Sequence, residues 1–312
     1  MPEAYDFAAE RRTPERVENR IRLALTLRKD TPWFEIEGVA LNRSRDHRLR
    51  LLIRAGIASK RIQALTPFDV VERSNEGYSP KWDEGDRPHS GALCLSDGRR
   101  GLSIFAEGLP EYNHLEGSDG IVALTLVRST GAIHNNRSVS PDHWMCPENQ
   151  CLREIDFRLA LYPHEGDMYG GNALAQYRLF QIPLLAHYDA ADQKIFHSGR
   201  PAVQAAGVPQ FFFREPEFPE IRLWGDRQFL ELHGRNIVVS ALKRSEDGKR
   251  YVLRCFNAGP RDEALSLALM RPIASADLAY LEEKPIRPLV FSGNTIEPFI
   301  VKAGEIVTIA FD

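Results

Sequence analysis

The sequence is poor in cysteine and carries little net charge. Its 312 residues include four cysteines, and no two of them form a Cys-x-x-Cys pair. Neither a disulfide scaffold nor a zinc ribbon is therefore indicated, and a reducing, cytoplasmic location is expected. The formal net charge of -3 gives no field strong enough to favour nucleic acid or an anionic membrane as a partner.

Long apolar runs and clean helical periods are also scarce. No run approaches the roughly 20 apolar residues of a membrane span, and residues 1–16 are charged where a signal peptide would have an apolar core. Few long windows follow an apolar period of 3.6, and the best helix candidate, residues 172–180, is short. These absences indicate a chain built mainly from strands.

Strand patterns fill most of the chain instead. In residues 19–27 apolar side chains recur with period two, which predicts a half-buried antiparallel strand. These side chains are Ile21, Leu23, Leu25 and Leu27. The apolar, β-branched run 121–127 predicts a further strand. The turn formers of residues 74–89 indicate a long loop, which in a compact domain is usually functional or disordered.

A second break, around residues 187–218, divides the strands into two groups. Beyond it, short strands follow one another regularly, and the Asp-Gly of residues 247–248 marks a hairpin. This tail has the size and rhythm of a small β-sandwich. Strands on both sides of a break predict an all-β fold with two packed-sheet units.

Four motifs in the middle of the chain resemble one known family. They are GLPEY at 108–112, ALTLVRSTG at 123–131, CPENQCLR at 146–153 and YPHEGD at 162–167. In order and spacing they are similar to the C-terminal β region of family 38 glycoside hydrolases, the α-mannosidase and mannosylglycerate hydrolase group. The similarity extends from about Val17 to Phe311, and motifs of the family's N-terminal half are not found in the sequence.

The resemblance implies a fold and a division of the chain. It implies a large antiparallel supersandwich of the galactose-mutarotase type over residues 17–205, followed by a smaller β-sandwich over residues 206–312. Residues 1–16 are expected to be an N-terminal lead. Because the family's β region packs on a barrel domain, one face of the supersandwich is expected to carry an exposed apolar patch, with self-association as the consequence.

The resemblance also places the chemistry outside this chain. Family members hold a zinc ion, a carboxylate nucleophile and a carboxylic acid on an N-terminal α/β barrel and the segment next to it. No catalytic residue, metal ligand or cofactor is therefore expected here, and zinc is expected only in a barrel domain. His187 and Asp189 match the family's His-x-Asp ligand pair only as a three-letter pattern, and a solvated loop is the favoured interpretation.

Arg128 and Glu111 are the candidate substrate-binding residues. Arg128 ends the apolar strand, and by resemblance it falls near the position from which the family's β region points an arginine toward the sugar. The alternative is a structural arginine that pairs with Glu111 or Asp119. A glycosidase carboxylate pair of Glu111 and Asp119 and a mutarotase-type pair of His114 and Glu111 are the other chemical interpretations. For Glu111 and Asp119, charges at turns and on the surface are the favoured interpretation.

Two further groups of polar and aromatic residues have a structural interpretation beside a binding one. Asp46, His47, Arg48 and Arg50 are dense enough for a buried ion cluster at a strand start, and a structural network is favoured over a ligand site. Aromatic side chains able to stack on sugar rings, with packing as the default interpretation, are Trp33, Tyr78, Trp82 and Trp144.

These observations lead to one functional hypothesis and two alternatives. The chain is expected to be the non-catalytic β domain of an α-mannosidase-like glycoside hydrolase, which supports and partly lines the sugar site of an α/β barrel domain or subunit. A mannoside is the corresponding carbohydrate ligand, and whether the chain belongs to an active enzyme depends on that barrel. The alternatives are an independent carbohydrate-binding or scaffold module and a sugar epimerase.

Overall fold

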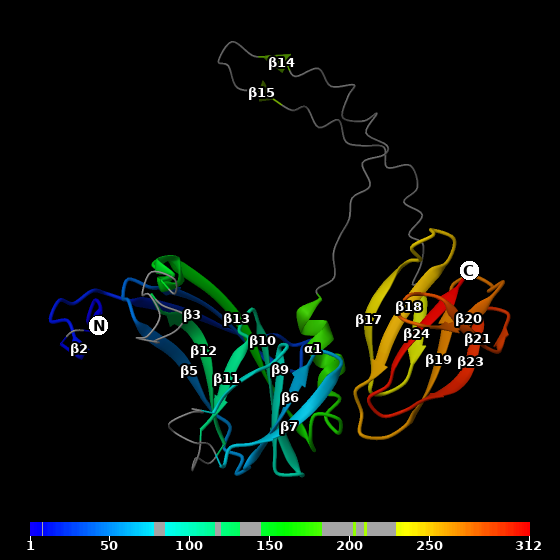
Figure 1. Cartoon of the computed structure of the whole chain (residues 1–312), viewed down its shortest axis with the longest axis horizontal. Helices are drawn as coiled ribbons and strands as arrows, with labels where there is room; N and C mark the ends of the chain where they lie inside the picture. Colours follow the sequence, from blue (N-terminus) through cyan, green and yellow to red (C-terminus); the bar gives the residue numbers. More distant parts are fainter. Residues whose placement is uncertain are drawn as a thin grey trace.

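The computed structural model describes residues 1–7, 9–77, 85–115, 120–131, 145–182 and 229–312, together with the backbone of β14 (Ala202–Val203) and β15 (Pro209–Gln210). These residues form an almost entirely β structure with one α-helix, α1 (Ala173–Gln181), where the pattern of residues 172–180 predicts it. All paired strands are antiparallel, and the larger sheets form two sandwiches (Figure 1). The predicted all-β fold, a larger sandwich followed by a smaller one, is confirmed.

The wider sheet of the larger sandwich has seven strands. Their order is β3 (Arg20–Leu27), β4 (Phe34–Leu41), β13 (Glu154–Glu165), β10 (Arg100–Glu107), β9 (Ala92–Ser96), β6 (Arg61–Thr66) and β7 (Asp69–Ser74). The twelve-residue β13 pairs with β4 on one side and β10 on the other. It therefore joins the N-terminal strands to the middle of the chain, and β3 and β7 form the two edges of the sheet.

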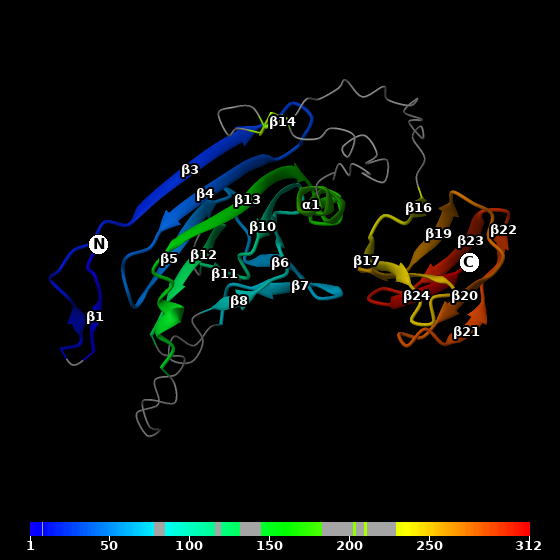
Figure 2. The same cartoon turned by 90° about the horizontal axis from the view of Figure 1, so that it is seen from above.

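The narrower sheet of this sandwich has four strands. Their order is β5 (His47–Arg54), β12 (Ile121–Ser129), β11 (Glu111–His114) and β8 (Asp86–Pro88). It stacks on one face of the seven-stranded sheet, and buried side chains such as Val122, Leu124 and Leu159 fill the space between the two (Figure 2). Strands β7 and β8 lie partly within residues 74–89, so the ends of that predicted loop are strand.

Helix α1 covers part of the opposite face of the seven-stranded sheet. Its Tyr177 and Phe180 pack on Phe105 of β10, and Trp33 contacts Phe105 and Phe180 edge to face. Trp33 is 7% exposed, so the packing interpretation of this aromatic residue is confirmed. Phe256 of the smaller sandwich belongs to the same buried cluster, which places the second sandwich against this side of the first.

The smaller sandwich pairs a four-stranded sheet with a five-stranded one. The first has the order β16 (Leu230–His233), β19 (Glu263–Leu269), β23 (Thr295–Val301) and β22 (Phe291–Ser292). The second has the order β17 (Ile237–Arg244), β18 (Tyr251–Asn257), β24 (Ile306–Phe311), β20 (Ala276–Ala279) and β21 (Pro285–Pro288). It has its own core, and it contacts the larger sandwich where the Arg178 guanidinium of α1 donates to the Val239 carbonyl.

Strand β3 departs from its prediction in one respect. The strand forms where expected, but its apolar side chains are exposed rather than half-buried: Ile21 46%, Leu23 50%, Leu25 61% and Leu27 75%. Register pairs Leu25 with Ile36 of β4, and Ile36 with Leu159 of β13, so these side chains continue the row that faces the core. Four strands do not cover seven, and β3 lies beyond the cover (Figure 2). We call Ile21, Leu23, Leu25 and Leu27 the uncovered row.

The N-terminal residues form a small separate element. Strands β1 (Tyr5–Asp6) and β2 (Arg11–Arg12) pair with each other. The Val17 amide donates to the Met1 carbonyl at 2.9 Å, so the first residue of the predicted supersandwich is tied to the start of the lead. The predicted boundary between residues 16 and 17 stays a prediction. The predicted boundary between residues 205 and 206 lies outside the described part of the chain. Among the described residues no helix has the length and apolar character needed to span a membrane.

Candidate functional site

Arg128 and Glu111 meet on the outer face of the four-stranded sheet. A β-bulge between Thr125 and Val127 interrupts the pairing of β12 with β5. As a result Leu126 and Val127 are both buried, and Arg128 turns outward where strict alternation would have turned it in. Glu111, on the neighbouring β11, projects from the same outer face, and the bulge thus decides which side chain reaches it.

The Glu111 carboxylate is held by three donors. Its Oε2 accepts from Arg128 Nη1 at 2.8 Å, and its Oε1 accepts from Thr125 Oγ1 at 2.6 Å and from Arg48 Nη1 at 3.5 Å. Arg48 also donates to the carboxylate of Asp86. One guanidinium therefore bridges two carboxylates that come from different strands, and it fixes both in place.

Arg48, Asp86, Glu111, Asn113, Thr125 and Arg128 form what we call the outer-face cluster. The exposed fractions of its charged side chains differ sharply. The side chains of Arg48, Asp86 and Glu111 are 22%, 19% and 22% exposed, whereas that of Arg128 is 64% exposed. Burial of Asp86 opposes its ionisation, but hydrogen bonds from Asn113 and Arg48 and the charge of Arg48 outweigh burial, so the pKa of Asp86 lies below its usual value. The cluster thus consists of a mostly buried set of ion pairs and one exposed guanidinium, that of Arg128.

Arg128 can pair with Glu111, as the structural interpretation predicts, and still be available to bind a ligand. The predicted pairing with Glu111 is present, and the guanidinium still offers donors to solvent. Asp119 lies outside the described residues. The predicted substrate contact of Arg128 and Glu111 stays a prediction.

The mutarotase-type pair of His114 and Glu111 is not assembled. The two residues are three positions apart on β11, so they project from opposite faces of the strand. His114 is 1% exposed, and its Nε2 lies 3.5 Å from Asn75 Nδ2 on the core side. Burial lowers the pKa of His114, although a contact with the Ser59 backbone opposes the change. This interpretation is therefore wrong.

The ion cluster predicted at the start of β5 is not formed as one group, because Asp46 and Arg48 belong to two different networks. The Asp46 carboxylate accepts from Gln150 Nε2 at 2.7 Å, in a structural network between segments far apart in sequence. Arg48 instead lies in the outer-face cluster, which the sequence pattern did not indicate. The remaining aromatic and His-x-Asp predictions lie outside the described residues: Tyr78, Trp82, Trp144, His187 and Asp189.

Four members of the cluster were missed by sequence reasoning. They are Arg48 as a partner of Glu111, Asp86, Asn113 and Thr125. Each is an outward polar residue on a strand, so alternation marks it as exposed. Which strands are neighbours decides that they meet, and alternation within one strand carries no such information.

The described residues do not fit a zinc site. Within them no group of three or more His, Cys, Asp or Glu side chains could hold a metal ion. A catalytic zinc needs three such ligands in convergent geometry with one open position. The outer-face cluster has only two carboxylates, and both are engaged by arginine.

Comparison with known proteins shows which proteins this chain is similar to. Residues 236–309 match the model of the glycosyl hydrolases family 38 C-terminal beta sandwich domain. A curated protein of Halalkalibacterium halodurans with the name "Putative mannosylglycerate hydrolase" is 27% identical over 306 residues, which are 96% of this chain and 29% of that protein.

Two solved structures from Enterococcus faecalis share the fold. An α-mannosidase from strain V583 superimposes with a TM-score of 0.69 at 23% identity and covers 98% of this chain and 30% of its own. A protein of glycosyl hydrolase family 38 superimposes with the same TM-score at 22% identity, over 100% of this chain and 34% of its own. The chain spans about a third or less of the length of each relative, and its described residues contain no α/β barrel. In sequence and in fold, the chain is similar to the C-terminal β region of these family 38 glycoside hydrolases, and residues 236–309 match the model of the family's C-terminal beta sandwich domain.

Proposed function

We propose that this chain is the non-catalytic β portion of an α-mannosidase-like glycoside hydrolase, and that it supports and partly lines the sugar site of an α/β barrel. The observation that carries the proposal is the uncovered row of β3. Its four side chains continue a buried row of the core and yet are 46% to 75% exposed. Such a row is typical of a surface that a second domain covers.

The energetics favour a partner at this edge. Burying one leucine or isoleucine side chain contributes about 1.5–3 kcal/mol, and four such side chains lie in one row along β3. The relatives extend far beyond the matched region, since it makes up 29% to 34% of their length. A catalytic barrel in that remainder, on the same polypeptide or on a separate subunit, is the proposed occupant, and zinc is proposed to bind there.

The outer-face cluster supports a lining role. Arg128 presents an exposed guanidinium, while Arg48 and Thr125 keep Glu111 in place whether or not Arg128 is engaged elsewhere. A guanidinium offers several donors in fixed geometry, which suits sugar hydroxyls or a carboxylate on an acidic glycoside. Carbohydrate binding, a role in mannose metabolism and a cytoplasmic location are parts of the same proposal.

Reconstitution tests this role. Turnover of an aryl α-mannoside is measured for a family 38 barrel polypeptide of the source organism, with and without this chain, and the chain alone is expected to show no turnover and no zinc after dialysis. Arg128→Ala should change the free energy of unfolding by at most about 0.5 kcal/mol, because Glu111 keeps two other donors. It should lower kcat/KM of the mixture by about tenfold or more, as expected for a lost charged hydrogen bond.

A matched control is available on the same face. Arg54 projects from β5 on the side of Arg48, is exposed, and lies at the far end of the strand. Arg54→Ala should leave kcat/KM unchanged. Equal effects of the two substitutions, or a large destabilisation by Arg128→Ala without loss of turnover, would rule out the lining role. Saturable binding of a mannoside to the chain alone at Arg128 would favour an independent binding module instead.

A further inference from the structure

The edge of the seven-stranded sheet at β3 is long and unprotected. β3 pairs with β4 over all its residues without a register shift, and it contains no proline. Its other side pairs with no strand among the described residues, and it forms the outer rim of the sheet in Figure 2. Such an edge presents a row of backbone donors and acceptors to any extended chain that reaches it.

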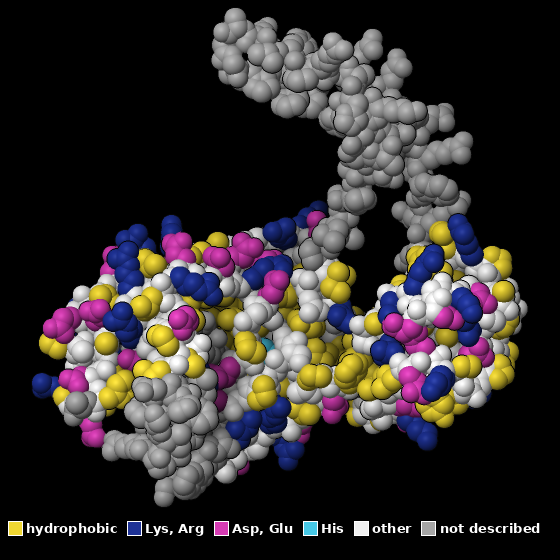
Figure 3. Space-filling view, turned by 45° about the horizontal axis from the view of Figure 1, so that its top comes forward, with side chains coloured by type: hydrophobic (Ala, Val, Ile, Leu, Met, Phe, Trp, Pro, Cys, Tyr) yellow, Lys and Arg dark blue, Asp and Glu magenta, His cyan; other side chains and the backbone are white. Residues whose placement is uncertain are grey.

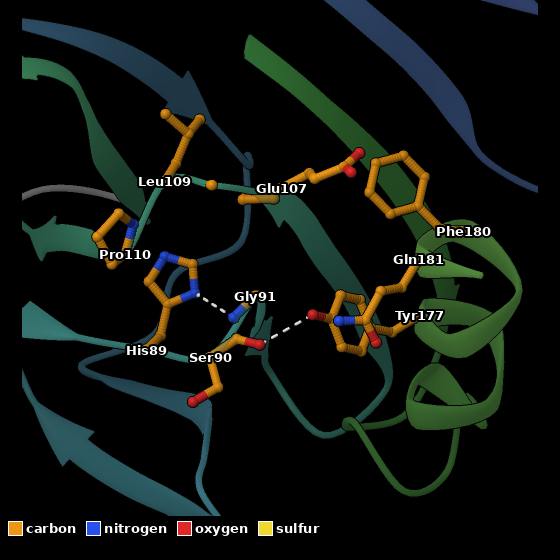
Figure 4. Close-up of a pocket in the computed structure, with 11 residues that line it drawn as sticks. His89, Ser90, Gly91, Glu107, Leu109, Pro110, Tyr177, Phe180 and Gln181 are labelled. Atoms are coloured by element: carbon orange, nitrogen blue, oxygen red, sulfur yellow. Dashed lines mark hydrogen bonds between the residues drawn. The ribbon is translucent and has the colours of Figure 1, made fainter. Parts of the chain in front are cut away.

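The other edge strands of the larger sheets have features that block such pairing. The pairings of β5 and β17 contain register shifts, β21 contains Pro285 and Pro288, and β8, β16 and β22 have four residues or fewer. β7 is hydrogen-bonded to β8 through Arg73. On the face over β10, α1 is fixed by the Tyr177 hydroxyl, which donates to the Ser90 carbonyl at 2.9 Å (Figure 4). Bulges, prolines, short strands and covering elements are the usual means of preventing edge pairing.

The N-terminal lead lies on the β4 side of β3 and leaves this edge accessible. The Glu3 amide donates to the Glu15 carbonyl at 2.9 Å, and the Arg45 amide donates to the Glu3 carbonyl at 2.7 Å. Glu3 therefore lies between the segment that leads into β3 and the segment that follows β4. The lead thus occupies the side of the chain that β4 occupies further on, and the opposite side stays open to a partner.

We propose that β3 of a second copy of this chain pairs with this edge, antiparallel and about a two-fold axis. Because residues directly opposite in antiparallel strands share a face, the two uncovered rows lie side by side and bury part of each other. A contact of this kind is self-complementary and closes after two copies. It goes beyond the proposed function, because it concerns the chain without a barrel. It uses the same edge, so the two contacts exclude each other.

The charges that flank β3 select one register. Two registers pair almost the whole of β3 with its copy, one centred on Leu23 and the other on Ala24, since positions equally far from the centre lie opposite each other. With Leu23 at the centre, Glu18 lies opposite Arg28 at both ends of the pair. With Ala24 at the centre, Arg20 lies opposite Arg28 instead. Opposite charges across a strand pair stabilise it and like charges destabilise it, so the dimer has Leu23 on its axis.

The surface around this edge does not oppose a second copy. Glu18 and Arg28 are both exposed, and within the described residues no ion pair engages Arg28. Glu18 pairs with Arg20 of its own chain at 3.3 Å, but such an exposed pair contributes little. Figure 3 shows Lys and Arg side chains interspersed with Asp and Glu over the face of the larger sandwich that it draws, and the net charge of the chain is -3. No strong field of one sign therefore repels the second copy.

Charge exchange tests the register in the full chain. In one copy Glu18 and Arg28 lie at opposite ends of β3, about 33 Å apart at roughly 3.3 Å per residue, so coupling between them arises only between copies. In sedimentation velocity, Glu18→Arg and Arg28→Glu should each weaken the dimer by about fivefold or more, because two attractive cross-strand pairs become repulsive. The double variant Glu18→Arg with Arg28→Glu should associate within about twofold of the wild type.

Lys29→Glu is the matched control. It changes the net charge as Arg28→Glu does, but Lys29 lies opposite Val17 in this register, so the affinity should stay within about twofold of the wild type. Amide exchange gives a second readout. Exchange in β3 should slow as the protein concentration rises, whereas exchange in β7 should not change. A contact in which the two uncovered rows stack face to face would leave the edge amides of β3 unprotected.

The proposal is overturned if the chain stays monomeric up to about 1 mM, if the double variant is as weak as the single variants, or if Arg28→Glu strengthens the dimer. It is also overturned if Lys29→Glu weakens the dimer as much as Arg28→Glu, or if exchange in β3 does not depend on concentration. None of these results bears on the barrel, whose docking is tested by mixing. A dimer that passes both tests and is not dissociated by a bound barrel polypeptide supports the dimer and contradicts docking of the barrel at β3.

Discussion

The two edges of the seven-stranded sheet are built in opposite ways. At the β7 edge, Glu72 forms an ion pair with Arg61 at 2.6 Å, and Arg73 donates to the Pro88 carbonyl of β8 at 2.7 Å. At the β3 edge, the four large apolar side chains of the uncovered row lie on the core-facing side of the sheet but beyond the reach of the second sheet, so they are exposed. Charges and bridges are the usual means of protecting an edge strand. The comparison shows that β7 is protected as edge strands usually are, whereas the apolar row of β3 is left exposed by the second sheet.

The largest difference in unfolding free energy should appear between two substitutions in the row that runs from β13 through β4 to β3, one at a covered leucine and one at an uncovered leucine. Leu159 is fully buried next to Ile36, and Leu25 is 61% exposed on the other side of Ile36. Leu159→Ala should cost about 2–5 kcal/mol of unfolding free energy, and Leu25→Ala at most about 0.5 kcal/mol. Urea denaturation of the isolated chain measures both. Similar losses in the two variants would show that β3 is covered in solution.

The stability of the chain should also depend on pH through the buried His89. The folded pKa of His89 is about 4, and its unfolded value is about 6.5. Because the folded pKa is the lower one, the neutral ring stabilises the fold fully above pH about 6.5, and this contribution is lost as the pH falls toward 4. The total is on the order of 3 kcal/mol.

Denaturation between pH 7 and pH 4 measures this contribution. His89→Phe should lose stability less steeply than the wild type, while Leu25→Ala should keep the wild-type slope because the uncovered row has no titratable group. Burial also lowers the pKa of His47 and His114, and both residues remain in all three proteins. Parallel slopes for His89→Phe and the wild type would contradict the burial of His89.

The uncovered row should also cause self-association of the isolated chain. Sedimentation velocity should show a concentration-dependent dimer or larger species, and Leu23→Glu with Leu25→Glu should weaken the association by about tenfold or more, since each leucine contributes about 1.5–3 kcal/mol when buried. Ile300→Glu is the matched control, because Ile300 is 62% exposed on β23 of the smaller sandwich. A monomeric wild type, or an equal effect of the control, would count against the β3 edge as the interaction surface.

Much of the fold could be predicted from local patterns. Alternation located β3, an apolar, β-branched run located β12, the short 3.6 period located α1, and the turn formers separated the strands of the smaller sandwich. Burial was less predictable. The period of two along β3 describes which side chains share a face, but whether a second sheet covers that face depends on the number of strands in each sheet.

The candidate site shows the same limit. Arg128 and Glu111 were identified and do meet, but the outward direction of Arg128 depends on the bulge after Thr125, which has no clear signal in an apolar run. Asp86 lay in a segment of turn formers, and its partner Arg48 lies 38 residues away in sequence. Contacts of this kind come from strand order, which a single sequence does not specify.

Hydrogen exchange at the two edges is the most direct test of the central claim, that β3 docks a catalytic barrel. The amides of β3 and β7 are followed in the chain alone and after mixing with a family 38 barrel polypeptide of the source organism. The account predicts that exchange in β3 slows by about tenfold or more on mixing, while exchange in β7 is unchanged. Unchanged exchange at both edges, or protection of β7 instead of β3, would contradict it.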